Sequence, residues 1–331
     1  MTRPALELVC PAGTPAGLRA AVDAGAHAVY CGFRDETNAR NFPGLNFNRA
    51  EMRDGIAYAH RRGAKVFVAL NTFMRAGATD IWQRAVDEAV AAGADALILA
   101  DVALVAYARE AHPRQRLHLS VQAAAATPEA IAFYRERFGI ARVVLPRVLT
   151  VEEVARLTAA VAPCETEVFV FGGMCVMAEG RCLLSSYATG KSPNMNGVCS
   201  PPSHVAYRET DGVLTAALGG FTIERFGHDE PAGYPTLCKG RFVANDAESH
   251  LFEDPVSLNA VELLPRLAEI GVAGFKIEGR QRGRAYVTAV VQIFRRAVDA
   301  LATGGKIDAG AIGALTEGQR DTKGAYRKAW R

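Results

Sequence analysis

Cysteine is the residue type best placed to do chemistry in this chain of 331 residues, which contains seven of them. Cys10, Cys31 and Cys164 lie in or beside apolar, strand-like segments, where a cysteine usually packs as a small buried hydrophobe. The odd total argues against a framework of disulfides. The other four lie in a stretch rich in glycine, proline, asparagine and serine: Cys175, Cys182, Cys199 and Cys238. We predict that these four thiols hold a metal centre.

The spacing of the four cysteines bears on which metal they hold. Runs of 6, 16 and 38 residues separate them in turn. Zinc sites usually pair their ligands in short Cys-x-x-Cys knuckles, and no such pair occurs here. Glycine or proline lies near each cysteine, which allows sharp turns and brings backbone amides toward sulfur. The spacing alone favours an iron–sulfur cluster only modestly, and a structural zinc site stays open.

The elements that must position these cysteines alternate regularly along the chain. Short apolar runs, typical of buried parallel strands, are separated by amphipathic helical stretches. The runs are at 6–10, 28–32, 65–71, 96–101, 117–121, 142–146, 167–171 and 273–278. Eight strands, most followed by a helix, predict an α/β fold, a closed (β/α)₈ barrel of the TIM type. A doubly wound open sheet is the alternative, but no glycine-rich phosphate loop follows the first strand.

One connection is far longer than the others. After the seventh strand, residues 172–255 show no clear helix and contain all four clustered cysteines. A loop of this length inside a compact domain is usually functional, and it begins at the carboxyl end of a strand, where barrel enzymes build their sites. We therefore predict one barrel domain over 1–303, an iron–sulfur-binding insertion at 172–255 within it, and a C-terminal tail at 304–331.

Polar residues at the predicted strand ends are the candidates for catalysis. They are Arg40, Asn71, Gln122, Arg147 and Glu278, with Arg280 beside the last. Arginine binds carboxylates with two parallel hydrogen bonds, so Arg40, Arg147 and Arg280 suit an anionic ligand. Each has a structural alternative: an ion pair for the arginines, above all Arg280 with Glu278, and loop hydrogen bonds for Asn71 and Gln122.

Composition limits the partners and the location. Half of the residues are apolar and 22% are charged, as in a folded globular protein. The net charge is +3 without a run of basic residues, so nucleic acid is not predicted as an obligatory partner. The apolar runs are too short for a transmembrane segment, and the first residues do not read as a signal peptide. We expect a soluble, cytoplasmic protein.

Several long motifs resemble a known family. Residues 171–182 read Phe-Gly-Gly-Met-Cys-Val-Met-Ala-Glu-Gly-Arg-Cys, and further motifs follow at 183–187, 192–194, 199–201, 234–241 and 276–280. Together they resemble the signature of the collagenase-like peptidase family of unknown catalytic type. The motifs at 37–42, 44–47, 99–101 and 144–149 resemble the branch of that family that hydroxylates a ubiquinone precursor without dioxygen. The similarity runs over almost the whole chain.

The resemblance implies a cofactor, a reaction and a partner. It implies a [4Fe–4S] cluster on the four cysteines and an enzyme subunit for oxygen-independent hydroxylation in ubiquinone biosynthesis under anaerobic conditions. The partner would be a UbiV-like paralogue in a heterodimer, and prephenate is a candidate oxygen donor. Two alternatives stay open: RNA-base hydroxylation, which other family members perform, and a non-catalytic electron-transfer or scaffold role. Peptidase activity is not expected, since the chain lacks the His-Glu-x-x-His and Gly-x-Ser-x-Gly motifs.

Overall fold

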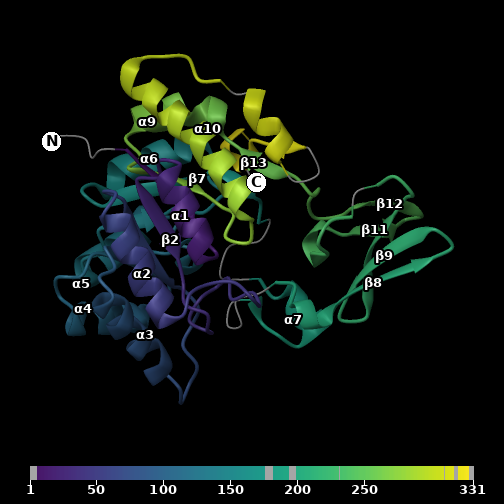
Figure 1. Ribbon diagram of the computed structural model, residues 1–331, viewed down its shortest axis with the longest axis horizontal. Helices are drawn as coiled ribbons and strands as arrows, with labels where there is room; N and C mark the ends of the chain where they lie inside the picture. Colours follow the sequence, from purple (N-terminus) through teal and green to yellow (C-terminus); the bar gives the residue numbers. More distant parts are fainter. Residues whose placement is uncertain are drawn as a thin grey trace.

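The eight predicted strands form a closed parallel barrel in the computed structural model, which describes residues 6–175, 182–193, 199–230, 232–308, 310–316 and 320–327 (Figure 1). Each strand pairs with the next in parallel, and the last pairs with both the first and the seventh, so the barrel is closed. The strands are β1 (Glu7–Pro11), β2 (Ala28–Cys31), β3 (Lys65–Leu70), β4 (Ala96–Leu99), β5 (Leu117–Leu119), β6 (Arg142–Val144), β7 (Glu165–Gly173) and β14 (Gly274–Ile277). The predicted TIM-type fold is confirmed.

Helices cover the outside of the barrel and begin where the sequence provides caps. The Thr127 hydroxyl accepts from the Ala130 amide, and Thr150 forms a reciprocal capping box with Glu153. Each of these hydrogen bonds satisfies an amide that the first helical turn leaves unpaired. The helices are α1 (Pro15–Asp23), α2 (Arg49–His60), α3 (Asp80–Ala91), α4 (Val102–Ala111), α5 (Pro128–Phe138), α6 (Val151–Val161), α9 (Leu264–Ile270) and α10 (Arg284–Thr303).

Two layers of side chains result from the alternation along the strands. The larger apolar core lies between the strands and the helices, and Trp82, Phe47 and Phe294 are among its largest fully buried members. A smaller set points into the barrel: Val9, Ala28, Tyr30, Phe67, Ala69, Ala96 and Ile98. Charged side chains occupy the rest of the interior, including Arg142, Glu167 and Lys276. Cys10, Cys31 and Cys164 are buried, as predicted.

The insertion after β7 contains regular structure that the sequence analysis did not predict. It consists of α7 (Leu184–Thr189), a three-stranded antiparallel sheet and a hairpin, and it extends away from the barrel (Figure 1). The sheet is β8 (Val205–Thr210), β9 (Val213–Leu218) and β10 (Phe221–Phe226), and the hairpin is β11 (Arg241–Ala244) and β12 (Ala247–His250). These strands were missed because much of their surface is exposed, so burial imposes little periodicity.

The chain returns to the barrel beside the root of the insertion. Strand β13 (Ser257–Asn259) pairs antiparallel with Phe171–Gly173 at the end of β7, and β15 (Asp321–Thr322) pairs with β13. The Tyr326 hydroxyl donates to the Phe169 carbonyl at 2.6 Å. Residues 321–326 therefore support the strand that leads into the first clustered cysteine. The remaining short 3₁₀ turns are η1 (Val121–Ala123), η2 (Pro202–His204), η3 (Leu237–Lys239), η4 (Val261–Leu263), η5 (Gly310–Leu315) and η7 (Gly324–Arg327).

Among the described residues, no helix has both the length and the apolar character needed to cross a membrane.

Candidate functional site

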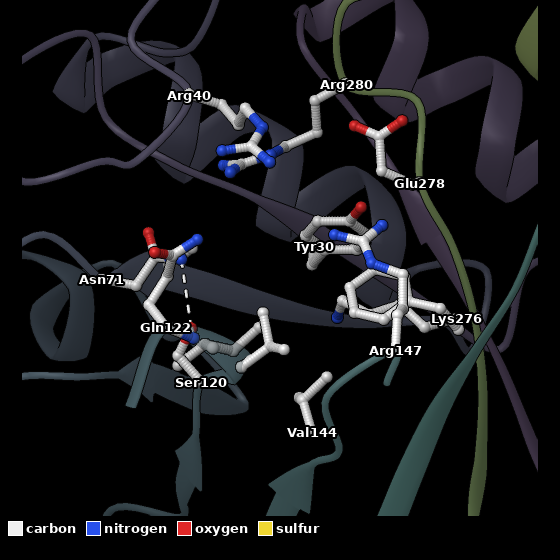
Figure 2. Close-up of a pocket in the computed structure, with 14 residues that line it drawn as sticks. Tyr30, Arg40, Asn71, Ser120, Gln122, Val144, Arg147, Lys276, Glu278 and Arg280 are labelled. Carbon is white, nitrogen blue, oxygen red and sulfur yellow. Dashed lines mark hydrogen bonds between the residues drawn. The ribbon is translucent and has the colours of Figure 1, made fainter. Parts of the chain in front are cut away.

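A pocket opens at the carboxyl ends of the barrel strands and collects all five candidate catalytic residues (Figure 2). Its empty space, counted out to the solvent, is about 480 Å³. Neighbouring strands bring together residues that lie far apart in the sequence, because parallel strands all end at one rim. We call this site the mouth pocket. Its polar lining is Tyr30, Arg40, Asn71, Ser120, Gln122, Arg147, Lys276, Glu278 and Arg280.

Three arginines dominate the electrostatics of the mouth pocket. Arg147 donates to the Gly173 carbonyl at 2.8 Å and lies 4.1 Å from the centre of the Phe169 ring. Arg40 donates to the Ala39 carbonyl at 2.8 Å. In Figure 2 the guanidinium groups of Arg40 and Arg280 lie close together. Such an arrangement attracts an anion, because like charges at close range are relieved by a shared counter-ion.

Arg280 does not form the ion pair with Glu278 that its sequence position suggested. Its guanidinium donates to the Asn38 side-chain carbonyl at 2.7 Å, while the Glu278 carboxylate accepts from the Gly173 amide at 3.3 Å. Burial and the positive charge of Arg40 lower the pKa of Arg280 to about 10, although the negative charge of Glu278 opposes this. Arg280 is therefore a buried cation held by a neutral amide.

Asn71 and Gln122 differ in how the structure uses them. The Asn71 side chain accepts from the Ala39 amide at 3.1 Å and donates to the Ser120 hydroxyl at 3.2 Å. Asn71 thus supports the loop that carries Arg40, as its structural alternative anticipated. Gln122 extends into the pocket beside it (Figure 2).

Three polar residues of the mouth pocket were missed by the sequence analysis: Ser120, which directly follows a strand, and Tyr30 and Lys276, which lie within strands. The Lys276 ammonium lies 3.8 Å from the centre of the Tyr30 ring and pairs with Glu167 at 2.7 Å. Burial raises the pKa of Tyr30, and its hydroxyl donates to the Ile277 carbonyl at 2.9 Å. A polar residue inside an otherwise apolar strand could have marked both Tyr30 and Lys276 as candidate pocket residues in the sequence.

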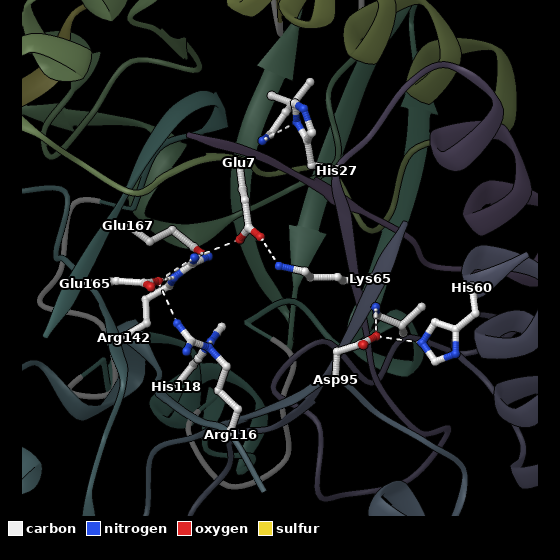
Figure 3. Close-up of polar contacts among 12 residues, drawn as sticks. Glu7, His27, His60, Lys65, Asp95, Arg116, His118, Arg142, Glu165 and Glu167 are labelled. Carbon is white, nitrogen blue, oxygen red and sulfur yellow. Dashed lines mark hydrogen bonds and ion pairs between the residues drawn. The ribbon is translucent and has the colours of Figure 1, made fainter. Parts of the chain in front are cut away.

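Below the mouth pocket, charged residues at the amino-terminal ends of the strands form a second polar group (Figure 3). Arg142 contacts three carboxylates, those of Glu7 at 2.7 Å, Glu165 at 2.6 Å and Glu167 at 3.0 Å. Lys65 also pairs with Glu7, at 2.6 Å, and Lys276 links this group to the pocket above. We call it the base cluster: Glu7, Lys65, Arg142, Glu165, Glu167 and Lys276.

The four clustered cysteines come together from separate parts of the insertion. Helix α7, just after Cys182, packs against the η3 turn that contains Cys238. The Tyr234 hydroxyl donates to the Ser200 carbonyl at 2.9 Å, which joins the segments of Cys199 and Cys238. Desolvation and the charges of the other three cysteines together raise the pKa of the Cys238 thiol to about 12. The four cysteines therefore influence one another electrostatically.

The donors around these thiols fit an iron–sulfur cluster. The amides of Leu184 and Ser185 donate to the Cys182 sulfur, as backbone amides do around cluster thiolates. Within the described ranges, no three Cys, His, Asp or Glu residues lie close enough to hold a single metal ion. Residues 176–181 of the cysteine motif lie outside the described residues.

The cysteine group and the mouth pocket are adjacent. Desolvation raises the pKa of the Cys199 thiol, and the positive charge of Arg40 opposes that rise. Gly173, two residues before Cys175, donates its amide to Glu278, and its carbonyl accepts from Arg147. Two residues of the pocket therefore contact the strand end that leads into the cysteine segment.

A closed parallel barrel with polar side chains gathered at the carboxyl ends of its strands defines a protein of the TIM-barrel class. The model of peptidase family U32 matches residues 13–324, and the chain belongs to that family. The predicted resemblance to collagenase-like peptidases is thereby confirmed at the level of the family.

The named relatives are described either as RNA-hydroxylation proteins or as a collagenase. The chain is 31% identical over 336 residues to the tRNA hydroxylation protein P of Escherichia coli, covering 93% of this chain and 71% of that one. It is 30% identical to the 23S rRNA 5-hydroxycytidine C2501 synthase of E. coli, covering 89% of this chain and 40% of that one. A collagenase of Porphyromonas gingivalis is 28% identical, covering 94% of this chain and 69% of that one. Two of these names describe RNA hydroxylation, and none describes ubiquinone biosynthesis.

Proposed function

We propose that this chain is the iron–sulfur subunit of an enzyme that hydroxylates an aromatic ring or base without dioxygen. The observation that carries the proposal is an arginine-lined pocket at the carboxyl ends of the strands of a U32 barrel, where β7 leads into the cysteine-bearing insertion. Cys175, Cys182, Cys199 and Cys238 would hold a [4Fe–4S] cluster, which supplies one-electron chemistry when bound.

The mouth pocket would bind the oxygen donor. Three arginines line this pocket: Arg40, Arg147 and Arg280. Glu278 is the one carboxylate among the lining residues. Guanidinium groups bind carboxylates strongly in a buried site, so an anionic donor such as prephenate fits the charge. In this proposal Arg147 and Arg280 bind and orient the donor, while Asn71 holds the loop of Arg40 in place.

Two ring substrates are candidates, and different observations favour them. The relatives favour an RNA base, because two of them are named for tRNA and rRNA hydroxylation. The motif resemblance favours a ubiquinone precursor, as for UbiU, the protein that works with UbiV. Charge also counts against a long RNA contact on the insertion, where residues 182–254 contain nine Asp and Glu but five Lys and Arg. A surface that follows a phosphate backbone is normally basic.

The substrate can be identified with a deletion strain grown with and without oxygen. Hydroxylated nucleosides and ubiquinone are both quantified by mass spectrometry. Loss of a modified nucleoside would assign the RNA substrate, and loss of ubiquinone only in anaerobic cells would assign the quinone. Normal levels of both under both conditions would contradict the proposal. Full activity in a variant that lacks the cluster would show that the four cysteines do not have the proposed role in the reaction.

The cofactor is tested on protein purified without oxygen. We expect about four irons and four sulfides per chain and a brown colour. Cys199→Ala should lose the iron, because it removes a ligand. The matched control Cys31→Ala should keep it, since Cys31 is buried in the barrel wall away from the insertion. Stoichiometric zinc in the wild-type protein would contradict the proposal, as would iron that survives Cys199→Ala.

We also propose that the chain works as a heterodimer with a UbiV-like paralogue, on the strength of the motif resemblance. Coexpressed, the two should elute as one peak with a one-to-one ratio in size-exclusion chromatography. Separate elution at micromolar concentration would contradict this pairing and would favour a subunit that acts alone.

A further inference from the structure

Three serine hydroxyls near the clustered cysteines are buried without a hydrogen-bond partner among the described residues: those of Ser185, Ser186 and Ser200. Ser185 and Ser200 are 2% and 1% exposed. A buried hydroxyl that loses water and gains no partner is unfavourable, and such groups are rare in folded proteins. Finding three in one region indicates that something else satisfies them.

The positions of Ser185 and Ser200 show what that partner is near. The Ser185 amide donates to the Cys182 sulfur, so this serine lies against the first segment of the cysteine group. Ser200 directly follows Cys199, and its carbonyl accepts from Tyr234 on the segment that leads to Cys238. In both residues a backbone group forms a hydrogen bond within the cysteine segments, whereas the side-chain hydroxyl forms none.

The chemistry of a hydroxyl limits the missing partner to a group that accepts a hydrogen bond or donates one. Cluster sulfurs and cysteine thiolates are acceptors only, and they carry negative charge. A hydroxyl directed at them would be satisfied without any other change in the fold. The same hydrogen bond would stabilise the more negative, reduced form of a cluster and so raise its reduction potential.

We propose that Ser185 and Ser200 donate hydrogen bonds to the sulfurs of the iron–sulfur centre and raise its reduction potential. The proposal rests on the cluster of the preceding section. Ser185 and Ser200 are thus positioning residues that adjust the cluster through its sulfurs without being ligands.

The test is a redox titration of Ser185→Ala and Ser200→Ala, followed by electron paramagnetic resonance on protein purified without oxygen. We expect both variants to keep the iron content of the wild type and to have a lower midpoint potential. The matched control is Ser203→Ala, because the Ser203 hydroxyl is exposed and already bonds to the His204 ring at 3.0 Å. Its potential should equal that of the wild type.

Thermal unfolding of the cluster-free proteins provides a second measurement. If the two hydroxyls have no partner without the cluster, replacing them by methyl groups should leave the unfolding temperature unchanged or raise it. A lower unfolding temperature would show that they already serve the protein fold and would overturn the inference.

The outcomes separate the two proposals. A wild-type protein without iron would refute the cluster, and this inference with it. A wild-type protein with iron whose potential is the same in both alanine variants would refute only the role of the serines.

Discussion

Both ends of the barrel interior hold charged groups, but they balance positive and negative charge differently. In the base cluster the three carboxylates face the three cations, and Arg116 adds a contact to Glu165 from the rim. In the mouth pocket, three arginines share the space with Glu278, whose carboxylate accepts from a backbone amide. Balanced charges connect strands, whereas unbalanced ones favour binding of an ion from outside. The charges of the base cluster therefore suit a stabilising role, and those of the mouth pocket suit binding of an anion.

Arg142→Ala should produce the largest effect, because it leaves the carboxylates of Glu7, Glu165 and Glu167 without their shared cation. Removing one partner of a buried ion pair costs about 3–5 kcal/mol. We expect a loss of this order in the free energy of unfolding, measured by urea titration. The control Arg84→Ala removes a surface pair with Asp80, where the Arg84 side chain is 64% exposed, and should change stability little. A similar loss in both variants would refute the distinction between buried and surface pairs.

The pH dependence of stability should report the same cluster. Burial alone would raise the pKa of Glu167, but the charges of Lys276 and Arg142 outweigh it and hold the pKa below its usual 4.5. The pKa values of Glu7 and Glu165 are lowered in the same way. Their stabilisation is present above pH 4.5 and is lost as the pH falls through the folded pKa values, at about 1.4 kcal/mol per group and pH unit.

His118 should make the stability begin to fall at a higher pH than the carboxylates do. Burial and the charge of Arg142 lower its pKa well below 6.5, so the folded state keeps it neutral while the unfolded chain takes up a proton. Stability should therefore begin to fall below pH 6.5 and fall more steeply below pH 4.5. Urea midpoints measured across this range provide the check, and higher stability at pH 5 than at pH 7 would contradict the assignment.

Arg280→Met should have the smallest effect on stability and a large one on binding. The change removes a buried cation that is held by an amide and not by a carboxylate, so stability should change by less than about 1 kcal/mol or increase. Affinity for prephenate, measured by calorimetry, should fall at least about tenfold through loss of a bidentate contact. Arg296→Met, on the exposed side of α10, is the control for both. A large loss of stability or an unchanged affinity in Arg280→Met would contradict the distinction between a stabilising base cluster and a ligand-binding mouth pocket.

The barrel was predictable because its strands are buried on both faces. Segments such as Lys65–Leu70 and Gly274–Ile277 are nearly continuous in buried residues, and this pattern is visible in the sequence. The strands of the insertion were not predicted, although Asp211-Gly212 and Gly219-Gly220, both with positive φ, form their turns. Such dipeptides are hairpin signals and were the evidence available.

The candidate site was predictable only where strand ends marked it. Arg40, Asn71, Gln122, Arg147 and Glu278 follow strands, and the structure places them in one pocket. Lys276 and Tyr30 were missed because each lies within a strand whose register decides which way it points. The contacts of Arg147 and Glu278 with Gly173 depend on distances between remote segments, which no local pattern reveals.

The support that residues 321–326 give to β7 has a consequence for the order of events during synthesis. Strand β15 rests on β13, which rests on Phe171–Gly173, and Tyr326 reaches the Phe169 carbonyl. A nascent chain presents its segments in order. Cys175 therefore leaves the ribosome long before residues 321–326, which support the strand that leads into it. The barrel can close once β14 has emerged, but the root of the cysteine segment gains its last contacts later. Cofactor loading would then follow translation, and cells would need to protect four reduced thiols in the interval.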